Sequence, residues 1–369
     1  MDSRIEKLAK GLVNYSCNVQ AGEKVLIEAI GTPDDIVRAL VKEVYNAGGV
    51  PFVNILNPRV NRELLLGMTE EAAKFKRDAD IAFMKQMDAY IAVRGGGNSY
   101  EKSDVPSEIT AMYDKIMRAV VDERVNNTKW VILRWPTEGM SQLAKMSTEA
   151  YEKFFFDVCT MDYAKMDRAM DALKALIDRT DKVRLVGPRD TDISFSIKGV
   201  GGKKCSGECN IPDGEVYTAP VKDSVNGVIH YNTPSIEKDI EFNDVRLVVK
   251  DGKIVEATAN RTADLNAILD TDDGSRYFGE FALGVNPFIE EPIGDILFDE
   301  KISGSIHMTP GCCYEDVSNG NKSAIHWDLV MIQTEKYGGG EIWFDGKLIR
   351  KNGLFVLPEL EALNPENLK

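Results

Sequence analysis

Hydrophobic and polar positions near the start of the chain follow first a helical period and then a strand-like run. Residues 2–15 carry an apolar stripe at helical spacing, and residues 24–30 form a short apolar run typical of a buried strand. A helix is predicted to begin at Thr32-Pro33, with threonine as its cap, and to end at Gly48-Gly49. Residues 50–56 are the next apolar run. This strand–helix–strand order indicates a parallel sheet.

The same alternation continues to residue 179. It predicts helices over residues 69–87, 107–124, 148–159 and 164–179, and strands over residues 89–94 and 130–135. The first half of the chain is therefore expected to be an α/β domain, with a small parallel sheet and helices around it.

The pattern changes near residue 181, where short strand-like segments replace the long helices. Strands are predicted over residues 182–187, 193–199, 226–231, 245–257 and 341–349, and one helix over residues 262–269. Asp251-Gly252 and Asp345-Gly346 are typical two-residue hairpin turns. The second half is thus predicted to be a β-rich α+β domain. Because single cores stop growing at roughly 250–300 residues, the sequence predicts two domains, over residues 1–185 and 186–369.

Composition and charge narrow the classes of partner. The chain has 45 Lys and Arg against 59 Asp and Glu, a net charge of −14, which argues against binding to nucleic acid. No run approaches ~18 apolar residues, and the charged N-terminus lacks the apolar core of a secretory signal. Neither a membrane span nor secretion is expected. The six cysteines, two of them adjacent at Cys312 and Cys313, favour reduced thiols and a cytoplasmic protein.

Candidate chemistry gathers in residues 302–331, which hold two of the three histidines. Apolar and polar residues alternate over residues 302–308 and 325–331, which predicts two half-buried strands. His307 lies in the first, and His326 and Asp328 share a face of the second, roughly 7 Å apart at about 3.4 Å per residue. Two imidazoles and a carboxylate on neighbouring strands are the beginning of a zinc-type site.

Two glutamates could complete this site. Glu280 is the only carboxylate in an apolar run over residues 276–285, and burying it is costly unless it is paired or bound to a cation. Glu215 follows a Pro-Asp-Gly turn and opens a short extended segment. Five donors exceed the four of one structural zinc and suit a two-metal hydrolytic site. The alternative for Glu280 is a buried salt bridge with Arg276 or Arg261.

Other candidate sites are less specific. Cys205 and Cys209 could form half of a zinc site, but no second Cys/His pair has matching spacing, so free thiols are favoured. The glycines at residues 95–97 and 199–202 lie outside any complete nucleotide-binding motif. His230 is expected to be an ordinary hydrogen-bonded residue.

Four segments in order, NIPDGEVYTAP, FGEFALGVNPFI, GSIHMTPGCCY and NKSAIHWDLVM, resemble the aminopeptidase T (aminopeptidase S) family of metallopeptidases. The resemblance extends across the chain and implies a homodimer whose active sites face an enclosed interior. It also implies a metal-dependent aminopeptidase that releases N-terminal residues from peptides, with two divalent ions per chain (zinc, cobalt or manganese). Tyr314 falls on the active-site tyrosine of the family. Five residues fall on its metal-ligand positions: Glu215, Glu280, His307, His326 and Asp328. The loop between His307 and His326 is shorter than in some members of the family.

The functional hypothesis is hydrolysis of N-terminal peptide bonds by a two-metal-activated water. Tyr314 would stabilise the oxyanion, and Glu215 and Glu280 are both candidates for the general base. One alternative is a two-metal phosphoesterase, although Lys322 is the only basic residue between His307 and His326. Another is a non-enzymatic, dimeric peptide-binding protein with one structural metal.

Overall fold

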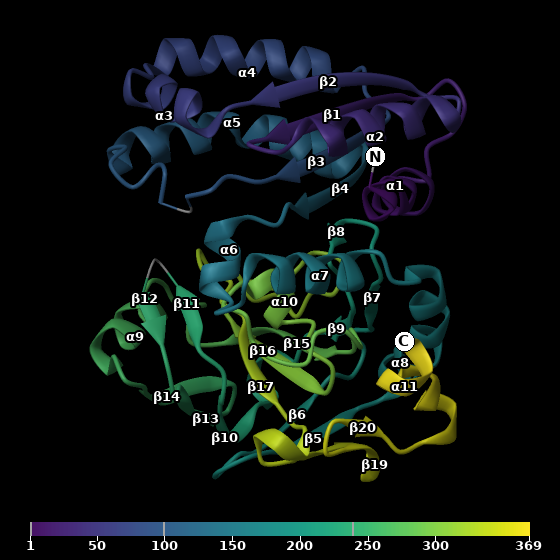
Figure 1. Ribbon diagram of the computed structural model, residues 1–369. Helices are drawn as coiled ribbons and strands as arrows, with labels where there is room; N and C mark the ends of the chain where they lie inside the picture. The colour runs from purple at the N-terminus through teal and green to yellow at the C-terminus, as the bar shows by residue number, and fades with distance from the viewer. Residues whose placement is uncertain (1, 99, 238–239) are drawn as a thin grey trace. The chain divides into compact units, whose positions relative to one another are not determined.

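A computed structural model describes residues 2–98, 100–237 and 240–369. The chain forms two compact units, Met1–Thr160 with Gly207–Pro212, and Met161–Ser206 with Asp213–Lys369 (Figure 1). The domain boundary at residue 185 stays a prediction. Within the described ranges, no helix combines the length and the apolar character that crossing a membrane requires.

The first unit is built on a five-stranded sheet with the order β2-β1-β3-β4-β8, in which all neighbours are parallel. Its strands are β1 (Lys24–Ile30), β2 (Val50–Leu56), β3 (Ala89–Arg94), β4 (Lys129–Arg134) and β8 (Asn210–Ile211). The parallel sheet predicted for this half is confirmed. Strand β8 was not predicted, because two residues that return from a distant part of the chain carry no periodic pattern.

Helices cover both faces of this sheet. The helices of this unit are α1 (Ser3–Lys10), α2 (Asp34–Asn46), α3 (Pro58–Leu66), α4 (Glu70–Met84), α5 (Ser107–Asn127), α6 (Glu138–Leu143) and α7 (Thr148–Cys159), with a π-helical segment (Gly11–Ser16) after α1. Met84 of α4 packs with Leu26 and Tyr90 on one face. Val25 and Ile27, which point to the other face, are fully buried. Burial on both faces explains the nearly continuous apolar runs of the strands.

The second unit contains an eight-stranded sheet and a five-stranded sheet, and neighbouring strands in both are antiparallel. The larger has the order β14-β13-β10-β6-β5-β18-β19-β20. Its strands are β5 (Lys182–Val186), β6 (Asp192–Ser196), β10 (Asn226–His230), β13 (Arg246–Lys250), β14 (Lys253–Thr258), β18 (Glu341–Phe344), β19 (Lys347–Lys351) and β20 (Leu354–Phe355). This confirms the β-rich second half.

The smaller sheet has the order β17-β16-β15-β9-β7. Its strands are β7 (Lys203–Cys205), β9 (Glu215–Thr218), β15 (Phe278–Gly284), β16 (Ser305–Pro310) and β17 (Leu329–Ile332). Strands β11 (Ser235–Glu237) and β12 (Ile240–Phe242) form a separate two-stranded sheet. The rest of the unit is α8 (Tyr163–Arg179), α9 (Thr262–Leu269), α10 (Ile296–Asp299), α11 (Pro365–Leu368) and 3-10 turns at Lys222–Ser224, Glu335–Tyr337 and Pro358–Leu363.

The prediction of half-buried strands around the histidines is wrong. Every residue of β15, β16 and β17 is buried. On one face of the sheet Phe281 of β15 packs against Phe195 of β6, with ring centroids 5.1 Å apart. Because the polar side chains of the opposite face are buried as well, they must find partners among themselves or in a bound group.

Candidate metal centre

One face of the smaller sheet gathers the predicted ligands. In the strand register Glu215 lies opposite Gly284, His307 opposite Ala282, and Thr309 opposite Glu280. Alternate residues of a strand point to the same face. Glu215, Glu280 and His307 therefore share one face of the sheet, and Phe281 points to the opposite face.

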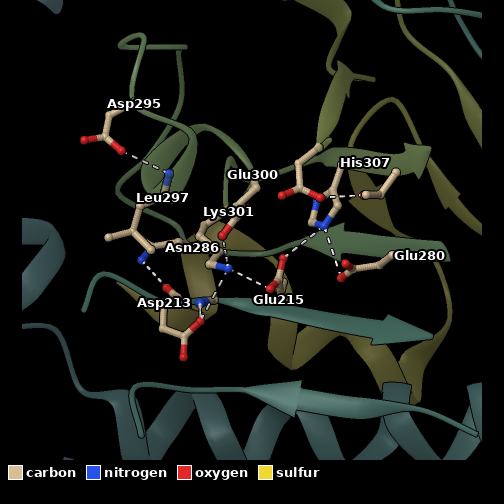
Figure 2. Close-up of polar contacts among 12 residues, drawn as sticks. Asp213, Glu215, Glu280, Asn286, Asp295, Leu297, Glu300, Lys301 and His307 are labelled. Carbon is tan, nitrogen blue, oxygen red and sulfur yellow. Dashed lines mark hydrogen bonds and ion pairs between the residues drawn. The ribbon is translucent and has the colours of Figure 1, made fainter. Parts of the chain in front are cut away.

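Glu280 lies between the two histidines. Its Oε1 is 3.4 Å from Nε2 of His307, and its Oε2 is 3.2 Å from Nε2 of His326. Each histidine also contacts one further carboxylate. Oε2 of Glu215 is 3.4 Å from His307 Nε2, and Oδ1 of Asp328 is 3.4 Å from His326 Nε2. Figure 2 shows Glu215 and Glu280 meeting His307. All five predicted ligands therefore meet in two groups of three that share Glu280.

The strand predicted over residues 325–331 is correct only from Leu329 onward. His326 lies before β17 and makes an isolated bridge with Gly311. Its ring is held by Nδ1, which donates a hydrogen bond to the Cys312 carbonyl over 2.8 Å, so Nε2 faces the carboxylates. A Cβ at Gly279 would lie 2.2 Å from that same carbonyl, so only glycine lets it approach β15. Such an outer hydrogen bond is what fixes the orientation of a metal-binding histidine.

Asp328 is oriented by a second buried residue. The hydroxyl of Thr309, which is fully buried, donates a hydrogen bond to Oδ1 of Asp328 over 2.5 Å. The carboxylate is thereby held toward His326 before any ion binds.

Tyr314 lies on the loop after β16, and the residue is 47% exposed. The ring contacts that of His326, with centroids 4.8 Å apart, and that of Tyr217 at 5.4 Å. Partial burial is the main cause that raises the pKa of the Tyr314 hydroxyl, and the Glu280 and Asp328 carboxylates raise it further. The phenol is therefore protonated and able to donate a hydrogen bond at the open side of the cluster.

Mutual contact shifts the pKa values of the ligands. Burial alone would lower the pKa of His307, but the carboxylates of Glu215 and Glu280 outweigh it and raise the pKa to about 10. Burial likewise opposes the charge on His326, whose pKa rises to about 10 through Glu280 and Asp328. Burial would raise the pKa of Glu280, yet its close contacts with both imidazoles lower it to about 2. Without metal the cluster thus holds protons on its imidazoles, which a divalent cation would displace.

The residues fit a divalent metal. Among the described residues, Oε2 of Glu215 and Nε2 of His326 are buried, and their contacts at 3.4 Å with His307 and 3.2 Å with Glu280 do not have the geometry of hydrogen bonds. Buried polar atoms without partners are costly, and here they belong to the predicted donors. Three carboxylates and two imidazoles are a donor set that zinc, cobalt and manganese accept.

Three neighbours of the cluster were missed by sequence reasoning. Lys301 is buried, with Nζ 2.6 Å from Oε1 of Glu215, and it also pairs with Glu300. Asp213, in the turn before β9, lies 3.8 Å from the same Nζ. Asp213 was visible as the acidic residue of the Pro-Asp-Gly turn, but Glu300 and Lys301 follow a short helix with no period that would have distinguished them.

The competing interpretations have clear outcomes. Arg276 pairs with Asp270 and Arg261 with Asp264, so neither arginine is the partner of Glu280. His230 lies 3.4 Å from Asp190, as an ordinary paired residue. Cys205 lies in a group with Asp213 and Glu215.

Comparison with known proteins adds sequence relationships. The profile of a family described as thermophilic metalloprotease (M29) matches residues 1–355. Aminopeptidase AmpS of Bacillus subtilis is 25% identical over 373 residues, which cover 89% of this chain and 90% of that protein. Aminopeptidase T of Thermus thermophilus is 25% identical over 397 residues, covering 93% and 95%.

Two solved structures share the fold. Wild-type AmpT from Thermus thermophilus superposes with a TM-score of 0.80 at 21% identity, covering 96% of this chain and 99% of that one. 2,5-Dihydroxypyridine dioxygenase from Pseudomonas putida KT2440 superposes with a TM-score of 0.64 at 13% identity, covering 97% and 99%. Since their names denote different reactions, the fold alone does not define the chemistry, and the site must.

Proposed function

Because the chain belongs to the thermophilic metalloprotease (M29) family, we propose that it is an aminopeptidase that uses two divalent ions to hydrolyse N-terminal residues from peptides. The relatives AmpS and aminopeptidase T carry aminopeptidase names, and both align over about nine tenths of this chain or more.

The shared position of Glu280 is the observation that carries this proposal. Its two oxygens face two different imidazoles at 3.4 and 3.2 Å, and a further carboxylate stands beyond each imidazole. A carboxylate whose two oxygens face two different imidazoles suits a bridge between two ions. Glu215, Glu280 and His307 would hold one ion, and Glu280, His326 and Asp328 the other.

Bound ions would supply a water activated near neutral pH and a polarised scissile carbonyl. The side chains of the protein would hold the ions in position and transfer protons during the reaction. Glu215 and Glu280 are the two candidate proton acceptors, because they come from the buried strands β9 and β15 and lie beside His307. A carboxylate of the cluster would also attract the free α-amine of a peptide, which favours cleavage at the N-terminus.

Tyr314 is proposed to donate a hydrogen bond to the oxyanion that forms at the scissile carbon. Its ring contact with His326 supports this role, and its exposure leaves the side chain accessible to a peptide.

The test is chelation followed by addition of zinc, cobalt or manganese, scored with a panel of aminoacyl anilides and with a phosphate ester. Loss and recovery of anilide hydrolysis is the expected result. Recovery of only phosphate-ester hydrolysis would favour a phosphoesterase. One tightly held ion per chain without turnover would favour a structural metal in a peptide-binding protein. The proposed homodimer is tested separately by light scattering.

A further inference from the structure

A buried lysine stands against the candidate metal ligands. The side chain of Lys301 is 3% exposed, and its Nζ lies 2.6 Å from Oε1 of Glu215 and 3.8 Å from Oδ1 of Asp213. It also forms an ion pair with Glu300. Figure 2 shows the ammonium group among these three carboxylates. An ammonium at this depth requires counter-charges, and the three carboxylates supply them.

The backbone holds Lys301 at this position. Its N–H donates to the carbonyl of Phe298 in α10 over 3.0 Å, and its carbonyl accepts a hydrogen bond from the N–H of Asn286 over 3.0 Å. The Asn286 side chain in turn donates to the Asp213 carbonyl over 2.7 Å. The segment around Lys301 is therefore tied to the turn before β9, where Glu215 begins.

The surroundings of the ammonium have the composition of a metal site. Donor atoms of Cys205, Asp213 and Glu215 lie within 4.8 Å of one another, a spacing that would suit a cation. The Lys301 ammonium lies against two of these three residues. Glu215 also belongs to the group with Glu280 and His307. Its Oε1 contacts Lys301, and its Oε2 contacts His307.

We propose that the Lys301 ammonium is a built-in cation that fills a third cation position beside the metal centre and holds Glu215 with Oε2 directed at His307. Lys301 is thus a positioning residue that does not contact the peptide. Without it, the buried carboxylates of Asp213, Glu215 and Glu300 would lose their ammonium counter-charge, and the position would take up a cation from solution. The inference rests on the proposed metal centre but not on turnover.

The first test is thermal unfolding of the chelated full-length protein with methylammonium chloride or an equal concentration of sodium chloride. Lys301→Ala should lower the Tm by about 5–10 °C, the scale of a broken buried ion pair, and methylammonium should restore several degrees. Wild type and Lys301→Arg should not respond. Lys204→Ala is the matched control, because its Nζ lies 2.7 Å from both Asp167 and Asp171, away from the cluster. A Lys301→Ala protein that responds to the two salts alike would overturn the proposal.

The second test counts bound ions after equilibration with cobalt and gel filtration. Lys301→Ala should bind one ion per chain more than wild type, and Lys204→Ala the same number. Lys301→Gln, which keeps a hydrogen-bond donor but no charge, serves as the second variant if Lys301→Ala does not fold. A wild-type count in the folded variant would refute a third cation position. Both tests keep their meaning if the protein hydrolyses no peptide, so failure of the proposed function is distinguishable.

Discussion

Thr309→Val tests whether the protein positions its ligands before an ion binds. Valine preserves the shape of this fully buried side chain and removes the hydroxyl that donates to Oδ1 of Asp328 over 2.5 Å. A hydrogen bond to a charged group contributes about 1.5–3 kcal/mol, and loss of such an orienting contact weakens metal binding by about 10- to 100-fold. Divalent-ion affinity should fall by that factor, mainly for the ion held by His326 and Asp328.

The assay is competition with a chromophoric chelator, which resolves the two affinities. Thr233→Val is the matched control, because the buried Thr233 hydroxyl also donates to an oxygen of the same strand region, the Val330 carbonyl at 2.7 Å, but not to a ligand. The Thr233→Val variant should be less stable than wild type and should keep both divalent-ion affinities. If Thr309→Val bound both ions within about twofold of wild type, or if the control lost as much affinity, the orienting role of Thr309 would be refuted.

Three further predictions concern catalysis and stability. His326→Ala and Asp328→Asn should abolish peptide hydrolysis while thermal unfolding stays cooperative, and near-normal turnover of either variant would remove that residue from the ligands. Tyr314→Phe should lower kcat by about 10²–10³, the effect of one lost oxyanion donor; unchanged kcat would exclude the hydroxyl from the reaction. The Ala324 N–H, at 2.6 Å, and neighbouring donors lower the pKa of Asp272 to about 2. Because this folded-state pKa lies below the ordinary value, Asp272 stabilises the fold above about pH 4 and loses that contribution as the pH falls to about 2. Asp272→Asn should reduce the acid dependence of the Tm in this window, and an unaltered profile would contradict the assignment.

Local patterns were sufficient for much of the fold. The first three strands begin and end at the predicted residues, as do α7 and α9, because each joins a clear apolar run or stripe to a recognisable cap or turn. The sequence did not reveal β8, whose two residues pair with β4 from far along the chain. It also missed α3, although Asn57 caps it and Pro58 begins it.

The candidate site shows the same division between local and long-range information. Alternation placed His307 and Glu280 on one face of their strands correctly, and the resemblance of four segments brought the five donors together. Alternation failed at His326, which is positioned by the Cys312 carbonyl and not by a strand. Lys301 was invisible for a related reason, since its partners Asp213 and Glu215 lie far away in sequence and meet it only through the fold.

The most direct measurement of the central claim is anomalous diffraction from crystals grown with cobalt or manganese. Two peaks should appear about 3.5–4 Å apart, one beside Glu215 and His307 and the other beside His326 and Asp328, with an oxygen of Glu280 bound to each. A single peak, or ions bound away from Glu280, would contradict the proposal of a two-ion centre that shares Glu280.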